Sequence, residues 1–573
     1  MKRVGRCGSN LIPSKASPGP LIRRVRLAVP DQMRRFSRPS MGEARFLRVC
    51  APARRGNTRK GAGFFMLTID KLSVTCRSDL RCILSDFSLQ LGPGERAALI
   101  GEEGDGKSTL LRLIHDPALA EGYVEWSGTI SPGGRTGYLP QELSPAELDA
   151  PARRLFDASR GFGRLTPRQR TALAAELGLD AAMFASERPL REFSGGERIK
   201  LQLAALAAEE PELYLLDEPS NDLDLDSLEW LEDFILSREQ PVLFVSHDET
   251  LIERTANVIV HLELLRRKTA PRATVARVPY RVYVESRCRA LARQEQAARK
   301  EREEFDRKLE RYRQIRQKVE SAQANLTRQD PHSGRLLKKK MHSVQAMGRR
   351  FERERERLTA MPEAEEAIFL SFPAEVAIPR GKRVLDLELP RLEAGGRLLA
   401  QGIELHVAGP ERICIVGGNG VGKTTLLRRI AAELLPRRDI RAAYMPQEFG
   451  ETLDGAPSPV ELLNRSGSRA EEQRIRALLG SLRYTSLEME RHCSDLSGGQ
   501  RAKLLLASMA LERADVLILD EPTRNLSPLS GPVVRDMLRA FGGAVISVSH
   551  DRKFISEVST RVYELGPNGL TEF

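Results

Sequence analysis

The sequence predicts an α/β protein in which one fold is built twice and a helical hairpin joins the two copies. Three observations support this prediction. Two glycine-rich loops, GEEGDGKS at residues 101–108 and GGNGVGKT at residues 417–424, repeat at an offset of 316 residues. Each loop follows an apolar strand and opens a Leu-rich helix. Between the copies lies a charged stretch with apolar residues three or four positions apart, as in packed helices.

The composition favours an intracellular protein with ordinary packed cores. With 573 residues, of which 41% are apolar, the chain is long enough for about three or four domains. No run of about 18 apolar residues could span a bilayer, and no secretory signal opens the chain. The seven cysteines contain no CxxC pair, which argues against a zinc site, an iron–sulfur cluster or a disulfide framework. We therefore expect a cytoplasmic protein with reduced thiols and no membrane partner.

The net charge of +12 is unevenly distributed. Residues 1–65 contribute +14 and residues 281–358 contribute +11, so the rest of the chain carries −13. The expected parts are an extension at 1–65, a first domain at 66–280, a basic helical linker at 281–362 with its tip near 327–340, and a second domain at 363–573. The Arg-rich extension has three interpretations: sequence added by a wrong start codon, a disordered basic arm, or an organelle presequence. We assign it no function.

The two glycine-rich loops have the pattern of a P-loop NTPase. Glycines let backbone amides approach phosphate oxygens closely, and the following helix points its positive end at the nucleotide. The lysine then reaches the β and γ phosphates, and the next hydroxyl is offered to Mg²⁺. The residues expected to bind ATP are Gly101, Gly104, Asp105, Gly106, Lys107, Ser108 and Thr109 in the first loop, and Gly417, Asn419, Gly420, Val421, Gly422, Lys423, Thr424 and Thr425 in the second.

Downstream of each loop, a buried strand ends in two carboxylates, in LYLLDEP and VLILDEP. The carboxyl end of a parallel strand is the usual ligand edge of an α/β sheet. Asp217 and Asp520 are therefore expected to hold Mg²⁺. Glu218 and Glu521 are placed to orient and polarise the attacking water, which is the remaining task in phosphoryl transfer.

Each half repeats two further polar residues around these carboxylates. VSHD presents His247 and His550, each 30 residues after its Asp, which predicts a pair of γ-phosphate sensors. YLPQE and YMPQE present Gln141 and Gln447 as contacts to Mg²⁺ and water. The expected Mg²⁺ ligands are Ser108, Gln141, Asp217, Thr424, Gln447 and Asp520.

The motifs FSGGE at 193–197 and LSGGQ at 496–500 resemble the signature motif of the ABC ATPases. The resemblance implies two ABC cassettes, each a RecA-like core with antiparallel β and helical subdomains, that pair head to tail within a monomer. Each signature helix would donate to the γ phosphate bound by the other cassette. The first loop would be completed by Ser497, Gly498, Gly499 and Gln500, and the second by Ser194, Gly195, Gly196 and Glu197. ATP hydrolysis at two composite sites is the expected activity.

Two departures from the family pattern concern details. Residues 68–86 and 384–405 contain no aromatic residue that could stack on adenine, so base selectivity is expected to be loose. Ser527 stands where Asp224 leads one to expect an acid, so communication between the sites is expected to be asymmetric.

The linker carries two apolar seams of helical spacing. The first consists of Tyr312, Ile315, Val319, Ala322 and Leu326, and the second of Leu337, Met341, Val344, Gly348, Phe351 and Leu358. DPHSG at 330–334 contains the Pro and Gly that end helices, so we expect an antiparallel hairpin with an exposed tip. The residues expected to contact RNA at this tip are Arg328, Arg335, Lys338, Lys339 and Lys340. The alternative is a spacer of solvated charge.

Tandem cassettes joined by such a linker resemble the ABC-F proteins, and the resemblance covers residues 66–573. It implies a partner, the ribosome, with contacts to rRNA and peptidyl-tRNA at the tRNA exit site and the peptidyl-transferase centre. The protein would bind in its ATP-closed state, protect against antibiotics or relieve stalled translation, and leave after hydrolysis. The alternative is the ATP-binding subunit of an ABC transporter, which would require separate membrane subunits.

Overall fold

A six-stranded sheet lies at the centre of each half of the protein. The computed structural model describes residues 65–221, 223–324, 331–359, 361, 372–373, 376–453, 455 and 457–573. The first sheet has the order β5 (Thr136–Leu139), β6 (Leu213–Asp217), β7 (Val242–Val245), β3 (Arg96–Ile100), β8 (Val258–Leu264) and β9 (Ala270–Ala276). The second has the order β13 (Ala442–Met445), β14 (Val516–Asp520), β15 (Ala544–Val548), β12 (Arg412–Val416), β16 (Arg561–Gly566) and β17 (Gly569–Glu572). In both sheets, all neighbouring pairs are parallel except the last.

The strands that carry the acidic pairs, β6 and β14, are buried along their whole length. Parallel strands covered on both faces read as continuous apolar runs, and this explains LYLL and VLIL. An antiparallel sheet accompanies each parallel one. β1 (Leu67–Cys76) pairs with β2 (Cys82–Leu91) and β4 (Val124–Pro132), and β10 (Arg383–Ala394) pairs with β11 (Arg397–Ala408). In each half, the two sheets and the helix that follows the phosphate loop share one apolar core.

In each half, a helical segment that contains the signature motif lies between two strands of the parallel sheet. It separates β5 from β6 in the first half and β13 from β14 in the second. In the first half it contains α2 (Pro145–Leu148), α3 (Arg153–Asp157), α4 (Arg160–Arg164), α5 (Pro167–Glu176), 3-10 turns at Ala181–Ala185 and Leu190–Glu192, and α6 (Gly195–Ala208). In the second it contains α13 (Gly450–Leu453), α14 (Pro459–Leu463), α15 (Arg469–Ser481), α16 (Ser486–Glu490), a 3-10 turn at Cys493–Asp495 and α17 (Gly498–Leu511). The predicted fold of two cassettes, each with a parallel core, an antiparallel subdomain and a helical subdomain, is confirmed.

The remaining helices flank the parallel sheets. They are α1 (Lys107–His115), a 3-10 turn at Pro117–Leu119, α7 (Leu225–Leu236), α8 (Glu249–Thr255), α9 (Leu265–Lys268), α12 (Lys423–Leu434), α18 (Gly531–Ala540) and α19 (Arg552–Val558). Asp224 caps α7 by accepting from the Ser227 amide, whereas α18 begins later, after Ser527 and Pro528. Where the second cassette has Ser527 in place of an acid, the helix therefore starts later. No helix within the described ranges is long and apolar enough to cross a bilayer.

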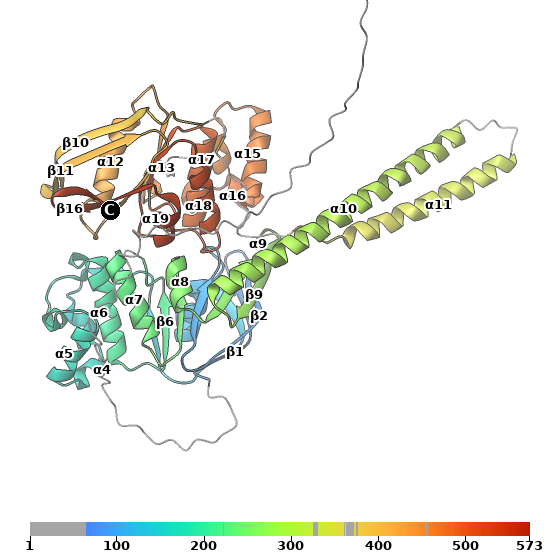
Figure 1. Cartoon of the computed structure of the whole chain (residues 1–573). Helices are drawn as coiled ribbons and strands as arrows, with labels where there is room; N and C mark the ends of the chain where they lie inside the picture. Colours follow the sequence, from blue (N-terminus) through green and yellow to red (C-terminus); the bar gives the residue numbers. More distant parts are fainter. Residues whose placement is uncertain are drawn as a thin grey trace, which may run out of the picture. The chain divides into compact units, whose positions relative to one another are not determined.

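The predicted helical hairpin between the cassettes is confirmed (Figure 1). α10 (Tyr280–Ala324) has 45 residues, and α11 (Pro331–Glu356) has 26 and lies antiparallel beside it. At 1.5 Å per residue, α11 is about 40 Å long. Phe351 of α11 contacts both Phe305 and Tyr312 of α10, with ring centroids 6.0 and 5.4 Å apart.

Two details of the predicted hairpin are wrong. DPHSG does not end a helix, because Pro331 begins α11 and Gly334 lies inside it; proline is well tolerated in a first turn, where its missing N–H is not needed. The seam on α10 also differs, since Ile315 and Ala322 are exposed.

The observed seam on α10 repeats every seven residues, at Ala298, Phe305, Tyr312 and Val319. Seven is the period that keeps one helix face against its partner, and a spacing of three or four admits more than one such face. Leu326, Arg328 and the rest of 325–330 lie outside the described residues, as does the extension at 1–64.

The base of the hairpin is fixed to the first cassette. The Tyr283 hydroxyl lies 2.7 Å from Nδ1 of His261 on β8, and Arg287 forms a buried ion pair with Glu263 at 2.7 Å. Tyr280 and Tyr283 are themselves buried in the core of that cassette. The first turns of α10 are thereby part of the cassette, so the hairpin moves with it.

The exchange of hairpin amides tests the observed seam. Phe305 is only 6% exposed, and replacing a buried Phe by Ala costs about 3 kcal/mol, so Phe305→Ala should speed hydrogen exchange in α11 by roughly a hundredfold. Ile315→Ala is the matched control: Ile315 is 44% exposed, and exchange should hardly change. Equal effects of the two substitutions would show that the seam is misplaced.

Candidate ATP-binding sites

The phosphate loops have the same backbone geometry in both cassettes. Gly106 and Gly422 cap α1 and α12 in the left-handed region, with φ of 88° and 103°. A side chain at Gly106 would place its Cβ 2.2 Å from Ile83, so only glycine fits. The ammonium of Lys107 donates to the carbonyls of Gly101 and Glu102, at 2.9 Å each. The first loop thus holds its lysine close to the turn that would receive phosphate.

Lys423 repeats this arrangement in the second loop, donating to the Gly417 and Gly418 carbonyls at 2.9 Å each. Its pKa is lowered by burial, which the nearby carboxylates of Glu521 and Asp224 oppose. A buried ammonium in this position favours an anionic partner, because its charge is poorly solvated.

The acidic pairs follow β6 and β14, as predicted. Glu218 and Glu521 both adopt a left-handed backbone with φ of 49°, which is uncommon for residues other than glycine and clusters at functional sites. Ser108 donates to the Asp217 carboxylate at 3.0 Å, and burial raises the pKa of Asp217 to about 6. In the second cassette, burial likewise raises the pKa of Asp520.

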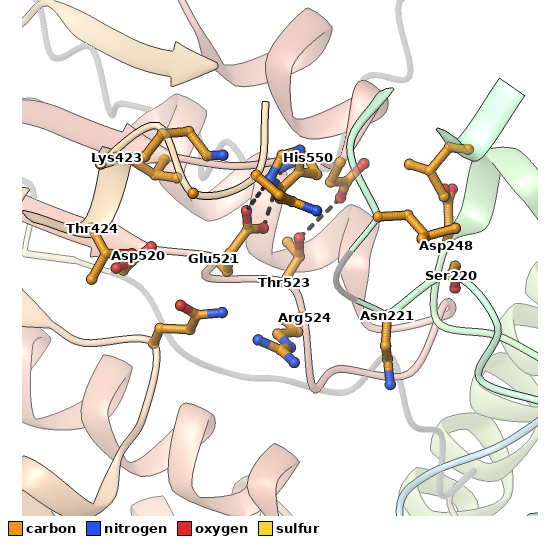
Figure 2. A pocket seen from close by; sticks show the side chains of 18 of the residues that line it. Ser220, Asn221, Asp248, Lys423, Thr424, Asp520, Glu521, Thr523, Arg524 and His550 are labelled. Atoms are coloured by element: carbon orange, nitrogen blue, oxygen red, sulfur yellow. Dashed lines mark hydrogen bonds and ion pairs between the residues drawn. The ribbon is translucent and has the colours of Figure 1, made fainter. Parts of the chain in front are cut away.

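The second site fits a hard cation. Both carboxylate oxygens of Asp520 are buried. Burial raises the pKa of this carboxyl, and the hydroxyl of Thr424 opposes that rise as a hydrogen-bond donor. Figure 2 shows the Thr424 side chain beside the carboxylate, and Gln447 lines the same pocket. Oxygen ligands of this kind, with one carboxylate and room for phosphate oxygens, suit Mg²⁺. Bound there, Mg²⁺ would neutralise phosphate charge.

The two glutamates sit in different surroundings. Oε1 of Glu218 lies 3.0 Å from Nε2 of His247, and the His247 amide donates to Oε2 at 3.2 Å. Burial opposes ionisation of Glu218, but these contacts outweigh it and hold its pKa below the ordinary value. His247 is fixed from the other cassette, since its Nδ1 donates to the Leu526 carbonyl at 2.7 Å.

Glu521 lacks so close an imidazole. Nε2 of His550 is 3.8 Å from its carboxylate, and the His550 amide donates to it at 3.3 Å. Burial raises the pKa of Glu521 to about 8. The same motif therefore produces two buried glutamates of different basicity.

A cavity of about 430 Å³ lies at the second phosphate loop, within the range of nucleotide-sized pockets (Figure 2). Its walls include residues of the second cassette that were predicted to bind ATP, Asn419, Gly420, Gly422, Lys423, Thr424, Thr425, Gln447 and Asp520, and two that were predicted to be catalytic, Glu521 and His550. The first cassette contributes Ser220, Asn221 and Asp248. Ala394 and Leu399 also line this cavity, and both belong to the segment 384–405, which contains no aromatic residue to stack on adenine.

A small cavity of about 20 Å³ lies beside the acidic tip of the first phosphate loop, and Lys107, Ser108 and Asp217 are not among its walls. It is lined by Glu102 and Glu103 of the loop and by Ser497, Gly499 and Gln500 of the second signature motif. The predicted pairing of the first loop with the second signature motif is thus present in the structure.

The first signature motif, which was predicted to complete the second phosphate loop, does not line the cavity there. Ser194 and Ser497 both cap their helices through a reciprocal capping box, with Glu197 and Gln500 as partners. However, Ser194, Gly195, Gly196 and Glu197 are absent from the walls of the second cavity. Gln141 is exposed, and it lines neither cavity.

Sequence reasoning missed two groups of residues. One is a charged cluster across the cassettes, in which Arg535 and Lys553 both reach Glu249, at 2.8 and 2.9 Å. No motif marks these positions. The other is the pair Glu102 and Glu103, which the motif treats as variable positions between glycines; their acidity was the available signal.

These phosphate loops, acidic pairs and signature helices on a doubled α/β fold define a tandem ATP-binding cassette ATPase. The ABC transporter family model matches residues 84–221 and 400–524. The tylosin resistance ATP-binding protein TlrC of Streptomyces fradiae is 33% identical over 554 residues, covering 86% of this chain and 96% of that protein. ATP-binding cassette sub-family F member 3 of Homo sapiens is 27% identical, covering 86% and 70%. The chain belongs to the ABC-F family, and it hydrolyses ATP.

Solved structures show a likeness of fold alone. The archaeal ribosome recycling factor aABCE1, solved in complex with the ribosomal stalk protein aP1, gives a TM-score of 0.52 at 17% identity. The likeness covers 88% of this chain and 90% of that one.

Removal of both glutamates should stop turnover. A general base contributes roughly 10²- to 10⁴-fold, so Glu218→Gln with Glu521→Gln should lower the ATPase rate at least a hundredfold while leaving ATP binding intact. Phosphate release and binding of a fluorescent ATP analogue measure the two effects. The exposed Glu121→Gln is the control and should leave the rate unchanged. Undiminished hydrolysis in the double variant would refute the assignment of both residues.

Proposed function

We propose that this ATPase binds the ribosome in its ATP-closed state and acts at the tRNA exit site and the peptidyl-transferase centre. There it protects against antibiotics or relieves stalled translation, and ATP hydrolysis releases it. The observation that carries the proposal is the basic hairpin between the cassettes. Arg335, Lys338, Lys339 and Lys340 near the start of α11 are all exposed, and residues 281–358 carry a net charge of +11.

Such a hairpin suits RNA for two reasons. Lysine and arginine side chains bind phosphate oxygens without requiring a base sequence, and folded RNA is bound chiefly through shape and backbone. The cassettes, by contrast, are acidic together, so a polyanion is attracted to the hairpin before any other part of the described chain. Arg328, the fifth expected contact, lies outside the described residues.

The connection between ATP and the hairpin runs through the hairpin base. Arg483 of the second cassette donates to the Leu264 carbonyl at 2.9 Å, and Lys268 pairs with Glu488 at 2.6 Å. Leu264 ends β8, the strand whose His261 and Glu263 hold α10. Through these contacts the second cassette is connected to the strand that positions the hairpin.

The relatives support a role in translation and resistance. TlrC is named for tylosin resistance, and aABCE1 for ribosome recycling. The Mg²⁺ that accompanies ATP would be held by Thr424, Gln447 and Asp520 in the second site, and by Ser108, Gln141 and Asp217 in the first. The protein would act as a cytoplasmic monomer in which the two cassettes pair with each other.

Sucrose-gradient sedimentation tests the proposal. The Glu218→Gln, Glu521→Gln protein with Mg·ATP should sediment with 70S ribosomes and should remain free without ATP. Replacing Lys338, Lys339 and Lys340 by Ala should weaken this binding and lower the slope of log affinity against log salt by about two to three, since each lost phosphate contact lowers it by roughly 0.7 to 0.9.

The matched control replaces three exposed arginines nearer the hairpin base, Arg281, Arg289 and Arg293, by Ala. It removes the same charge and should change binding much less. Binding that is lost equally in both variants would point to charge alone rather than to the tip. Absence of binding to ribosomes in the trapped protein, with recovery in the membrane fraction instead, would replace the proposal by the transporter alternative.

A further inference from the structure

The two phosphate loops differ in charge at three equivalent positions. The first loop carries Glu102, Glu103 and Asp105 where the second has Gly418, Asn419 and Val421. Asp105 is buried and accepts from the Glu102 amide at 2.8 Å, so it stabilises the loop from within. A triphosphate approaching the first loop therefore meets a concentration of like charge that the second loop lacks.

Glu103 makes the contact that a nucleotide would otherwise make. Its Oε2 accepts from the Gly499 amide at 2.9 Å, in the first turn of the second signature helix. This amide belongs to the group that would donate to a γ phosphate in a composite site. A carboxylate and a phosphate oxygen are equivalent acceptors at a helix N-terminus, because both place negative charge against free amides and the helix dipole.

Glu102 reinforces the same junction with two ion pairs to the second cassette. Its carboxylate lies 2.5 Å from Lys503 and 3.1 Å from Arg483. The three side chains are at most 18% exposed, so solvent screens these pairs little. Lys503 lies on the signature helix itself, six residues after Ser497.

The equivalent lysine in the first cassette is differently placed. Lys200 lies over the Trp230 ring, 4.9 Å from its centroid, within its own cassette. The second loop opens onto the cavity of about 430 Å³, while only about 20 Å³ remains between Glu102, Glu103 and the second signature motif. The contrast follows the sequence difference between the loops, since a Gly and an Asn cannot form the pairs that two Glu form.

We propose that Glu102 and Glu103 form an acidic clip that takes the place of the γ phosphate and closes the first site. The two sites therefore load in order. ATP enters the second site freely and reaches the first only in competition with the acidic clip. The order of ATP loading does not depend on whether the hairpin binds the ribosome.

Isothermal titration of the full chain with Mg·ATPγS tests the clip. In the Lys423→Ala background only the first site is observed, and in the Lys107→Ala background only the second. We expect the second site to bind at least tenfold more tightly than the first. Replacing Glu102 by Gly and Glu103 by Asn, as in the second loop, should tighten the first site at least tenfold.

The reciprocal variant is the matched control. Gly418→Glu with Asn419→Glu, in the Lys107→Ala background, should weaken the second site by charge but cannot by itself create the Lys503 and Arg483 pairs. Equal affinity of the two sites in the Lys423→Ala and Lys107→Ala proteins would overturn the proposal. An unchanged first-site affinity after removal of both glutamates would also overturn it. Because the first comparison leaves the clip intact, it decides the question even if the Glu102, Glu103 variant does not fold.

Discussion

The structure depends on the contact between a phosphate loop of one cassette and the signature helix of the other. A signature helix presents free backbone amides that must find acceptors, and at the first site the Glu103 carboxylate supplies one. Glu102 adds two ion pairs to this contact, one with Lys503 and one with Arg483, both in the second cassette. The arrangement of the first ATP site, and the register of the two halves there, follow from these acidic residues.

A second group of contacts between the cassettes is held by charge as well. Glu249 bridges Arg535 and Lys553 of the second cassette, and His247 donates to the Leu526 carbonyl. The contact of His247 with Leu526 keeps its imidazole 3.0 Å from Glu218, whereas Glu521 faces the larger of the two loop cavities with its imidazole 3.8 Å away. Two copies of one motif set thus acquire different chemistry from their neighbours, and the difference originates in a few residues between the motifs.

The doubled fold and the hairpin were predictable because their signals are local. Glycines of the phosphate loop, apolar strands ending in Asp-Glu and capping boxes at the signature serines each act within a few residues. The seam of α10 was predicted only in part, since three-four spacing admits Ile315 while packing selects a seven-residue repeat. The acidic clip and the Glu249 cluster depend on residues hundreds of positions apart. Their partners could be identified only once the fold placed Lys503 beside Glu102.

Distances across the two sites, measured by pulsed electron spin resonance, test the account most directly. Spin labels at Asp79→Cys and Arg501→Cys span the first site, and labels at Arg397→Cys and Arg198→Cys span the second, in proteins without other reactive cysteines. Mg·ATP added to the hydrolysis-deficient protein should shorten the second distance and leave the first nearly unchanged, because the acidic clip already holds that site closed. Equal shortening of both distances would contradict the account.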